Sequence, residues 1–472
     1  MPAVTAELLA RACARHLPDV IGVEAPTRLS GGASRETWSF DATHADGSIE
    51  ALVLRRDPGA TIGSTDRSTE YELVRAAGRA GVAVPAVRFL LDDGDDLGAG
   101  FVMERIDGET IPRKLLRDEP YAEARRVMVG QCGEAAARIH AVPLDTLPDL
   151  AVQGPAALID QYRGVLDLLG EPHPVFELGL RWLDAHVGDL PDRPDALVHG
   201  DFRTGNFIVG PEGLRSVLDW ELAHLGDPIE DLGWFCVKSW RFGNVDRRAG
   251  GFGTAEELLG AYVAAGGGPV DADHLHFWEV FGTLKWGVIC EMQTFSHLNG
   301  LVRSVELAAL GRRVAEQEWD LLALIDPDAP ATGTAPADVP ADGAGTAGET
   351  IHDRPTLTEL VASVREYLER DVMAVAGRVG FHARVAARVL AMAERELALG
   401  PAQARAEHAR LTELLGADGD IRALTVELAR RIRAGEVAPT DRATLDAVRA
   451  SVRSKLAVAN PAYAVPPDDV TD

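Results

Sequence analysis

Asp201, Asn206 and Asp219 have the residue types and the spacing that phosphoryl transfer requires. They lie in the segments VHGDFRTGN, at 198–206, and LDW, at 218–220. This reaction asks for little covalent chemistry from a protein: it needs a base that orients the acceptor hydroxyl and ligands for a divalent metal that neutralises phosphate charge. An Asp, an Asn five residues later and a second Asp supply that set.

A hairpin would bring the two candidate metal ligands together. The segment NFIVGPEGLRSVLDW has apolar runs on both sides of a turn at Gly210 to Gly213. The strand that ends at Asp219 would therefore return beside the strand that starts near Asn206.

Asp201 would then lie on the loop before the hairpin, where it can accept a hydrogen bond from the substrate hydroxyl, while His199 and Gly200 shape that loop. The competing interpretation is that the candidate residues only cap a helix and form turns, as short polar side chains often do. The complete ordered pattern favours the chemical interpretation.

The motif HGDFRTGN, followed by DWE and GDPIEDL, resembles the aminoglycoside phosphotransferase family, a branch of the protein-kinase-like fold. The resemblance implies ATP and Mg²⁺. Asp201 matches the family's catalytic base, and Asn206 and Asp219 match its metal ligands. Asp227 and Asp231 match acidic positions of the following segment, where a structural supporting role is the better expectation.

Two other segments would contact ATP through their backbone if the resemblance holds. One is the LSGGAS loop, where glycines would let amides approach the phosphates, although a Gly-Gly pair is more often only a turn. The other is the segment that would link two lobes and bind adenine. The residues concerned are Gly31, Gly32, Ser34, Met103, Glu104 and Ile106.

A strand cation that binds the phosphates would have to be arginine, because the first lysine of the chain is Lys114. The resemblance favours Arg55 over Arg56, and strand alternation puts the two on opposite faces; a solvated charge at a sheet edge is the alternative for Arg55. Glu70 resembles the helix glutamate that pairs with this cation, with Glu72 as the alternative.

The motifs depart from those of protein kinases. Gly200 stands in place of the arginine of HRD, DWE stands in place of DFG, and no APE-like segment follows. These departures favour a small-molecule kinase over a protein kinase. Similarity in LVLRRDP, FVMERIDG and HGDFRTGNF to the kinase-like domain found beside acyl-CoA dehydrogenases implies a hydroxyacyl thioester or another metabolic alcohol as acceptor. An aminoglycoside-like antibiotic is the other acceptor class.

The composition mainly excludes classes of partner and site. The 472 residues carry a formal charge of -26, so nucleic acids and anionic membranes are not expected partners. No signal peptide and no apolar run long enough to span a bilayer are found, which predicts a cytoplasmic protein. The four cysteines form no CxxC pair and are expected to be buried thiols.

The pattern of elements predicts an α+β fold. Strands at 36–43, 50–56 and 100–105, with a helix from Ser68 to Ala80, precede a mainly helical region. Together with the resemblance, which spans about 21–320, this predicts a bilobal protein-kinase-like fold and a separate C-terminal all-α helical bundle. The expected domains are a β-rich nucleotide-binding lobe at 1–106, a helical catalytic lobe at 107–325, a disordered linker at 326–350 and a helical bundle at 351–472.

The helical bundle after the linker gives no hint of chemistry. Its apolar positions recur at helical spacing, for example at Leu357, Leu360, Val361 and Val364, and are expected to face a core. Thr356 and Glu359 form a candidate capping box. The bundle resembles a module of unknown role, so it is expected to bind a protein partner or a second copy of the chain.

Three hypotheses follow. The favoured one is an ATP- and Mg²⁺-dependent small-molecule kinase. The second is a catalytically weak nucleotide-binding scaffold that recruits a partner through its helical bundle, which the arginine in place of lysine supports. The third, a protein kinase, is disfavoured by the missing motifs.

Overall fold

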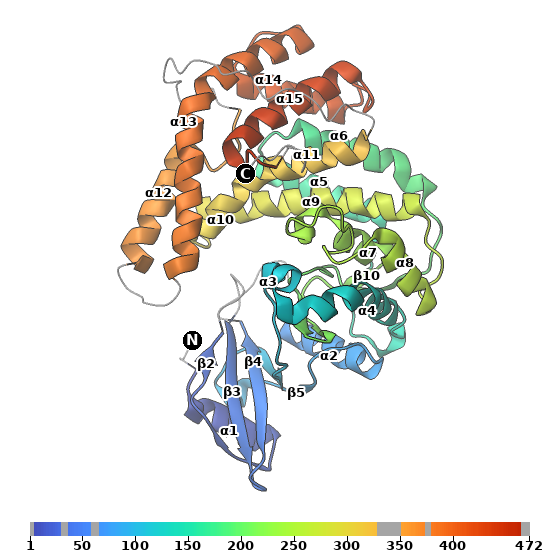
Figure 1. Ribbon diagram of the computed structural model, residues 1–472, viewed down its shortest axis with the longest axis vertical. Helices are drawn as coiled ribbons and strands as arrows, with labels where there is room; N and C mark the ends of the chain where they lie inside the picture. The colour runs from blue at the N-terminus through green and yellow to red at the C-terminus, as the bar shows by residue number, and fades with distance from the viewer. Residues whose placement is uncertain (1–3, 30–35, 58–65, 328–350, 373–378, 464–472) are drawn as a thin grey trace. The chain divides into compact units, whose positions relative to one another are not determined.

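The computed structural model describes residues 4–29, 36–57, 66–327, 351–372 and 379–463. Its internal contacts divide the chain into two compact units (Figure 1). The first contains residues 1–155 and 191–279, and the second contains residues 156–190 and 280–472. The second unit thus combines helices from before and after the segment at 326–350. These units are defined by contacts and do not test the predicted domain boundaries, which stay predictions.

The first unit begins with a six-stranded sheet in the order β1-β3-β4-β6-β5, with β2 paired to β3. All of the neighbouring strands are antiparallel. The strands are β1 (Val20–Val23), β2 (Thr27–Arg28), β3 (Glu36–His44), β4 (Ile49–Arg56), β5 (Val87–Leu90) and β6 (Gly100–Glu104). The three strands predicted from the sequence are confirmed as β3, β4 and β6, and the predicted helix is confirmed as α2 (Arg67–Arg79).

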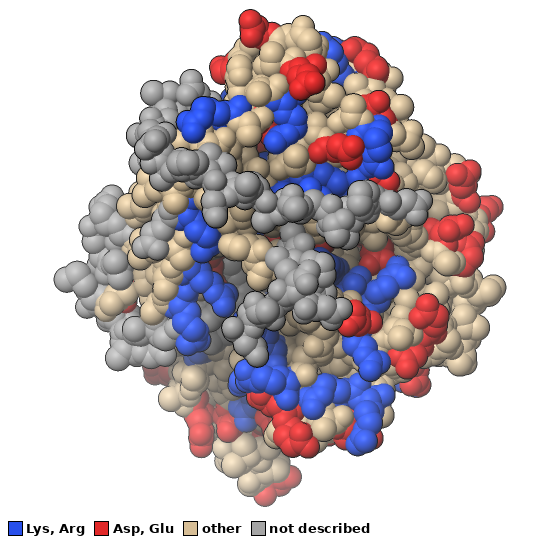
Figure 2. Space-filling view, turned by 45° about the horizontal axis from the view of Figure 1, so that its top comes forward, with Lys and Arg blue, Asp and Glu red and all other residues tan. Residues whose placement is uncertain are grey.

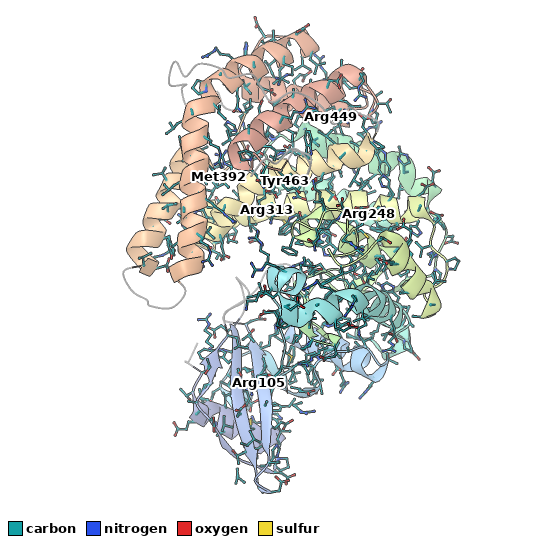
Figure 3. The ribbon with its side chains drawn as sticks, viewed as in Figure 1. Arg105, Arg248, Arg313, Met392, Arg449 and Tyr463 are labelled. Atoms are coloured by element: carbon teal, nitrogen blue, oxygen red, sulfur yellow. The ribbon has the colours of Figure 1, made fainter. Side chains whose placement is uncertain are left out.

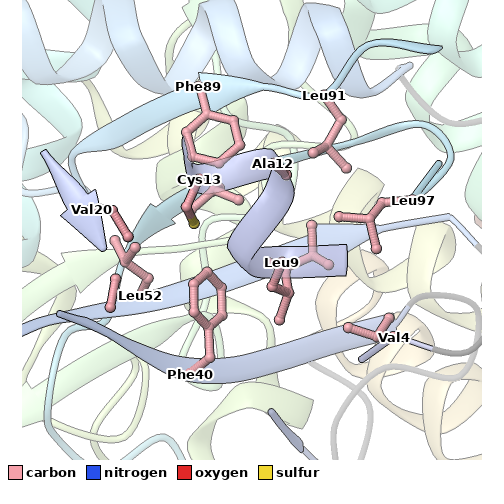
Figure 4. Packing of buried hydrophobic residues seen from close by; sticks show 13 residues of the cluster. Val4, Leu9, Ala12, Cys13, Val20, Phe40, Leu52, Phe89, Leu91 and Leu97 are labelled. Atoms are coloured by element: carbon pink, nitrogen blue, oxygen red, sulfur yellow. The ribbon is translucent and has the colours of Figure 1, made fainter. Parts of the chain in front are cut away.

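The two faces of β4 pack against different helices. Leu52 and Leu54 join the cluster around α1 (Ala6–His16), which Figure 4 shows packed on the sheet. Val53 belongs to a second cluster, against which Tyr71 of α2 packs. Alternation therefore turns Arg55 toward the face that α2 covers. Helix α1 was not among the predicted elements, although its buried residues Leu9, Ala12 and Cys13 recur at helical spacing.

The remainder of the first unit is mainly helical. Two small antiparallel sheets accompany the helices: β7 pairs with β10, and β8 pairs with β9. The bounds are α3 (Pro112–Arg117), α4 (Ala122–His140), β7 (Ala196–Val198), β8 (Phe207–Gly210), β9 (Gly213–Val217), β10 (His224–Gly226), α7 (Ile229–Cys236) and α8 (Ala255–Ala264). The first residues of α9 (Ala272–Leu298) also belong to this unit.

The second unit is helical throughout its described residues. Besides the rest of α9, it contains α5 (Pro155–Leu169), α6 (Pro174–His186), α10 (Val305–Leu310), α11 (Val314–Ile325), α12 (Leu357–Tyr367), α13 (Val379–Leu415), α14 (Ile421–Arg433) and α15 (Arg442–Ala459). Helix α14 packs against α6, and α15 packs against α11. Arg449 and Tyr463, labelled in Figure 3, hydrogen-bond Asp326 and Asp320.

Predictions for the C-terminal helices are mostly confirmed. Thr356 and Glu359 form the capping box: each backbone amide donates to the other residue's side chain, at 2.6 and 3.4 Å. Leu360 and Val364 are buried. The prediction was wrong for Val361, which is 48% exposed, because it lies just outside the narrow face of α12 that packs on neighbouring helices.

Three further expectations concern the whole chain. All four cysteines are free and buried, as predicted. None of the helices in the described ranges combines the length and the apolarity needed to cross a membrane. On the face drawn in Figure 2, basic side chains stand among acidic ones, so the net charge does not make that face uniformly acidic. The predicted linker falls almost wholly outside the described residues.

Candidate active site

The predicted hairpin is present and sets the positions of two candidate metal ligands. Strands β8 and β9 pair from Phe207 opposite Val217 to Gly210 opposite Gly213. The ladder continues for one more bond, in which the Leu218 amide donates to the Asn206 carbonyl at 2.8 Å. Asn206 and Asp219 therefore stand at the same end of the hairpin, one on each strand's continuation.

Asp201 is held by three hydrogen-bond donors. Its Oδ2 accepts a bond of 2.6 Å from Asn206 Nδ2. Its Oδ1 accepts bonds of 2.8 Å from Trp234 Nε1 and from Arg203 Nε. Each carboxylate oxygen has two lone pairs, so the two donors fill Oδ1 while Oδ2 keeps the capacity for one further bond.

His199 ties the Asp201 loop to the hairpin. Its Nδ1 accepts from the Asp201 amide at 3.2 Å, and its Nε2 donates to the Leu218 carbonyl at 3.1 Å. This pattern requires the neutral tautomer with the proton on Nε2. Burial lowers the pKa of His199, which agrees with a neutral ring. The ring therefore positions the loop and does not act as a charged group.

Asp231 supports the same loop from α7. Its carboxylate accepts from the amides of His199 and Gly200 at 2.8 and 2.9 Å, and His140 Nε2 lies 3.1 Å away. Burial opposes ionisation of Asp231, yet its hydrogen bond with His140 lowers the pKa of the carboxyl below its ordinary value. Gly200 has φ +77°, and a Cβ there would meet the Leu222 carbonyl at 2.3 Å, so only glycine fits.

Asp227 bonds a different set of residues from Asp201. It accepts from the Ile229 amide at 2.9 Å, from Trp278 Nε1 at 3.1 Å, and pairs with His274 at 2.5 Å. Burial opposes its ionisation, but the bond with His274 lowers the pKa of Asp227. These contacts fasten the start of α7 to α9, as expected of a supporting residue.

Arg55 joins the sheet to the hairpin. Its Nε lies 3.2 Å from Glu70 Oε1, and its Nη2 makes an ion pair with Asp219. Burial opposes the charge on Arg55, but Glu70 and Asp219 raise its pKa. Asp219 itself has φ 69°, a left-handed conformation that Asp tolerates better than most residues.

The structure distinguishes Arg55 from Arg56 and Glu70 from Glu72. Arg56 points to the other face of the sheet, where it bonds Glu36 and the Leu97 carbonyl. Glu72 pairs with Arg75 on the surface of α2. Glu70 is the carboxylate beside Arg55, and its second partner is Arg67.

A pocket lies between these residues within the first unit. Its walls include Arg55, Glu70, Phe101, Met103 and Asp219. The lining combines apolar side chains, suited to a base, with charged side chains, suited to phosphates.

The predicted adenine-binding segment runs on from this pocket. The amides of Glu104 and Arg105 are used in bonds of 2.9 Å to the carbonyls of Ala86 and Ala51. Among the described residues, the amide of Ile106 makes no such bond, so it is the donor left for a ligand. Gly31, Gly32 and Ser34 lie outside the described residues.

The donor set at the hairpin end fits Mg²⁺. Asn206 uses Nδ2 to donate to Asp201, at 2.6 Å to Oδ2 and 3.0 Å to the carbonyl, so its Oδ1 faces away from that residue. An amide oxygen and the Asp219 carboxylate are hard oxygen ligands of the kind this ion prefers. Asn206 and Asp219 are therefore the residues that would hold the ion.

Sequence reasoning gave no role to three residues that contact this site: Arg203, Trp234 and His140. Arg203 was visible inside the motif, two positions after Asp201, and could have been identified from that place. Trp234 and His140 are 33 and 91 positions from their carboxylate partners, and no local pattern marks them.

Curated relatives match about half of the chain. Mouse acyl-CoA dehydrogenase family member 10 is 29% identical over 300 residues, which is 57% of this chain and 27% of that protein. Human acyl-CoA dehydrogenase family member 11 is 28% identical over 266 residues, 50% of this chain and 33% of that protein. The chain thus spans about a quarter to a third of the length of these relatives.

A solved structure shares the fold. A protein from Ralstonia eutropha assigned as an aminoglycoside phosphotransferase superposes with a TM-score of 0.52 at 22% identity. The likeness covers 67% of this chain and 97% of that one. The bilobal kinase-like fold predicted from the sequence is confirmed.

Two family models match separate segments. Residues 373–463 match a domain of unknown function, DUF6285. Residues 26–270, more than half of the chain, match the phosphotransferase enzyme family, APH, and include Arg55, Glu70, Asp201, Asn206 and Asp219. The chain is a member of this phosphotransferase family.

Proposed function

We propose that this protein transfers the γ-phosphoryl group of ATP to a hydroxyl group of a small molecule and that it requires Mg²⁺. The observation that carries the proposal is the placement of three residues at one end of the hairpin: Asn206 bonds Asp201, and Asp219 follows the strand whose Leu218 amide bonds the Asn206 carbonyl. Asp219 also lines a pocket together with Arg55 and Glu70. A base, two oxygen ligands and a phosphate-binding cation are the parts that this reaction uses.

In this proposal Asp201 is the general base. Its Oδ1 is filled by Trp234 and Arg203, so the acceptor hydroxyl donates to Oδ2 and passes its proton there as the new oxygen–phosphorus bond forms. Asn206 fixes this carboxylate from the other side. When bound at Asn206 and Asp219, Mg²⁺ would neutralise phosphate charge.

Arg55 and Glu70 would serve ATP binding. The Arg55 guanidinium is held by a buried glutamate on α2 and extends to the edge of the pocket. A planar guanidinium can bind two phosphate oxygens at once, which suits the α- and β-phosphates. Met103 and the amide of Ile106 would hold the adenine.

For the acceptor, we favour a hydroxyacyl thioester or a related metabolic alcohol over an aminoglycoside. The curated relatives are named as acyl-CoA dehydrogenase family members and match about half of this chain. An enzyme that modifies acyl thioesters is a chemically coherent neighbour for such a domain.

Calorimetric titration with ATP, with and without Mg²⁺, tests the proposal first. We expect binding that strengthens when Mg²⁺ is present. An ADP-release screen against hydroxyacyl thioesters, aminoglycosides and macrolides then identifies the acceptor class. A protein that binds no nucleotide under either condition would disprove the assignment.

Asp201→Asn separates chemistry from binding. Removing a general base costs roughly 10²- to 10⁴-fold in rate, while the amide can still accept from its neighbours, so ATP affinity should stay unchanged. Steady-state turnover and calorimetry on the same sample measure both. Full turnover by this variant would show that another group is the base.

A nucleotide-binding scaffold with little activity is the second candidate. The ion pair between Arg55 and Asp219 favours it, because the cation takes up one carboxylate oxygen that the metal would use. In that case ATP would bind equally well with and without Mg²⁺, and no acceptor would stimulate ADP release.

A further inference from the structure

Arg203 is held beside the candidate base by two contacts, and a neighbouring glycine leaves space for its side chain. Its Nε donates to Asp201 Oδ1 at 2.8 Å. Its guanidinium carbon lies 4.5 Å from the centre of the Trp240 ring, a cation–π distance. Gly205 leaves room for it, because a Cβ at that position would meet Arg203 Nη1 at 2.8 Å.

The terminal nitrogens of the guanidinium have no hydrogen-bond acceptor among the described residues. Arg203 uses only Nε in hydrogen bonds there, and its Nη1 and Nη2 donate none. The side chain is 24% exposed. Its stacking partner Trp240 is only 4% exposed, which fixes the direction of the side chain.

The other cations of the site differ in this respect. Arg55 is shared between Glu70 and Asp219, and Arg248 and Arg241 both pair with Glu279. Arg203 keeps up to four N–H groups for a ligand. An anion bound there would lie beside the Asp201 carboxylate, whose other oxygen, Oδ2, takes the acceptor's proton.

We infer that Arg203 is a catalytic residue that binds the phosphoryl group during its transfer; this rests on the proposed function. As the acceptor oxygen bonds to phosphorus, the bond between phosphorus and the β,γ-bridging oxygen breaks, the hydroxyl proton passes to Asp201, and ADP leaves. Negative charge on the equatorial oxygens of the moving group is then stabilised by Arg203 Nη1 and Nη2. An arginine so placed acts mainly in the transition state.

The test uses ADP, Mg²⁺ and aluminium fluoride, because planar aluminium fluoride imitates the phosphoryl group in flight and no acceptor needs to be known. Calorimetry gives the affinity for MgADP with and without fluoride. In the wild-type protein we expect fluoride to tighten MgADP binding by about 100-fold, since transition-state analogues bind more tightly than ground states.

Arg203→Met should lose about nine-tenths or more of that gain, because one transition-state donor group contributes on the order of 10²-fold. Its affinity for MgADP alone should match the wild type, which also shows that the site is folded. Arg203→Lys keeps a charge without the planar donors and should retain part of the gain. Arg247→Met is the matched control, because Arg247 is an exposed arginine elsewhere in the first unit, and this variant should keep all of the gain.

Arg203→Ala provides a second measurement. Millimolar guanidinium ion should restore the fluoride-dependent gain in this variant, since the ion can stack on Trp240 in the vacated space, and sodium ion at the same ionic strength should not.

The outcomes distinguish a failure of the proposed function from a failure of the role inferred for Arg203. If the wild type binds no MgADP, the proposed function fails and the inference falls with it. If the wild type binds MgADP but fluoride adds nothing, or adds equally in Arg203→Met, the proposed function stands and the inference is overturned. That second result is also expected if Arg203 binds a charged part of the acceptor.

Discussion

Two buried cations in this protein each lie between two carboxylates, in different surroundings. In the candidate site, Arg55 pairs with Glu70 and with Asp219, whose side chain is 32% exposed and lines a pocket. In the second unit, Lys455 Nζ lies 3.0 Å from Glu318 and 2.9 Å from Asp353, whose side chains are 1% and 9% exposed.

The Lys455 group continues into a closed network. His173 lies at the start of α6, with Nδ1 3.2 Å from Glu318 and Nε2 2.8 Å from Glu291. His173, Glu318 and Asp353 have the ligand types of a metal site, but the ammonium of Lys455 already bonds two of the three. The network joins α15 to helices that precede the predicted linker.

This difference shows what each arrangement can do. A carboxylate at a pocket can exchange its arginine for a metal ion or leave that arginine to a phosphate, because water and ligands reach it. Glu318 and Asp353, at 1% and 9% exposed, are far less accessible to ions and ligands than Asp219. Removing Lys455 leaves their charges uncompensated. We therefore expect Lys455 to act on stability and Arg55 to act on catalysis.

Lys455→Met should have the largest effect on stability. The change leaves Glu318 and Asp353 buried without their cation, and breaking such a pair costs about 3–5 kcal/mol. The midpoint of urea unfolding should fall accordingly. Lys114→Met is the control, because the Lys114 side chain is 46% exposed and its partner is the carboxylate of Glu109; the midpoint should change little, since exposed ion pairs contribute little to stability. Equal midpoints for both variants would contradict the comparison.

Arg55→Met should act on turnover. Loss of a phosphate-binding cation is expected to lower kcat/KM for ATP about 100-fold, or about 2.7 kcal/mol. Stability should fall by no more than about 1 kcal/mol, because Glu70 keeps Arg67 as a partner. Kinetics and urea unfolding on one preparation measure both. A variant that unfolds as readily as Lys455→Met would place Arg55 with the structural cations.

The pH dependence of stability should sharpen the comparison further. Burial alone would lower the pKa of His173, but Glu291 and Glu318 raise it to about 10 from an ordinary 6.5. A raised pKa means that the folded state binds the proton more tightly, so this stability is complete below pH 6.5 and is lost as pH rises toward 10.

Thermal melting of the wild type between pH 6 and pH 10 measures this loss, at roughly 2–4 °C per kcal/mol. His173→Gln should melt lower at pH 6 and show a flatter profile, because it has no proton to lose. An unchanged slope in the variant would mean that other groups carry the dependence.

Local patterns were enough to predict part of the geometry of the candidate site. The hairpin could be predicted because its turn and flanking apolar runs are contiguous. Strand alternation placed Arg55 and Arg56 on opposite faces, and the family resemblance favoured Arg55. The orienting contacts of Asp201 were not predictable in this way. Trp234 donates to Asp201 from α7. Which side chain bonds this carboxylate depends on how the helices pack and not on the spacing of residues in the sequence.

The charged network of the second unit lay beyond local patterns altogether. Its members come from five separate segments, and each alone resembles an ordinary surface charge on a helix. Glu318 and Lys455 are 137 positions apart. Only tertiary packing shows that the helices after the predicted linker share a compact unit with helices far earlier in the chain.

The β8–β9 hairpin also limits which changes in chain length the site can accept. Its two strands measure out the separation between Asn206 and Asp219, and they are joined by only Pro211 and Glu212. Deleting one residue within either strand would turn the following side chains to the opposite face of the sheet. Asn206 and Asp219 would then no longer face the same site. Residues inserted at the turn between β8 and β9 would leave Asn206 and Asp219 aligned. We therefore expect insertions and deletions among related chains to occur at this turn and not within the strands.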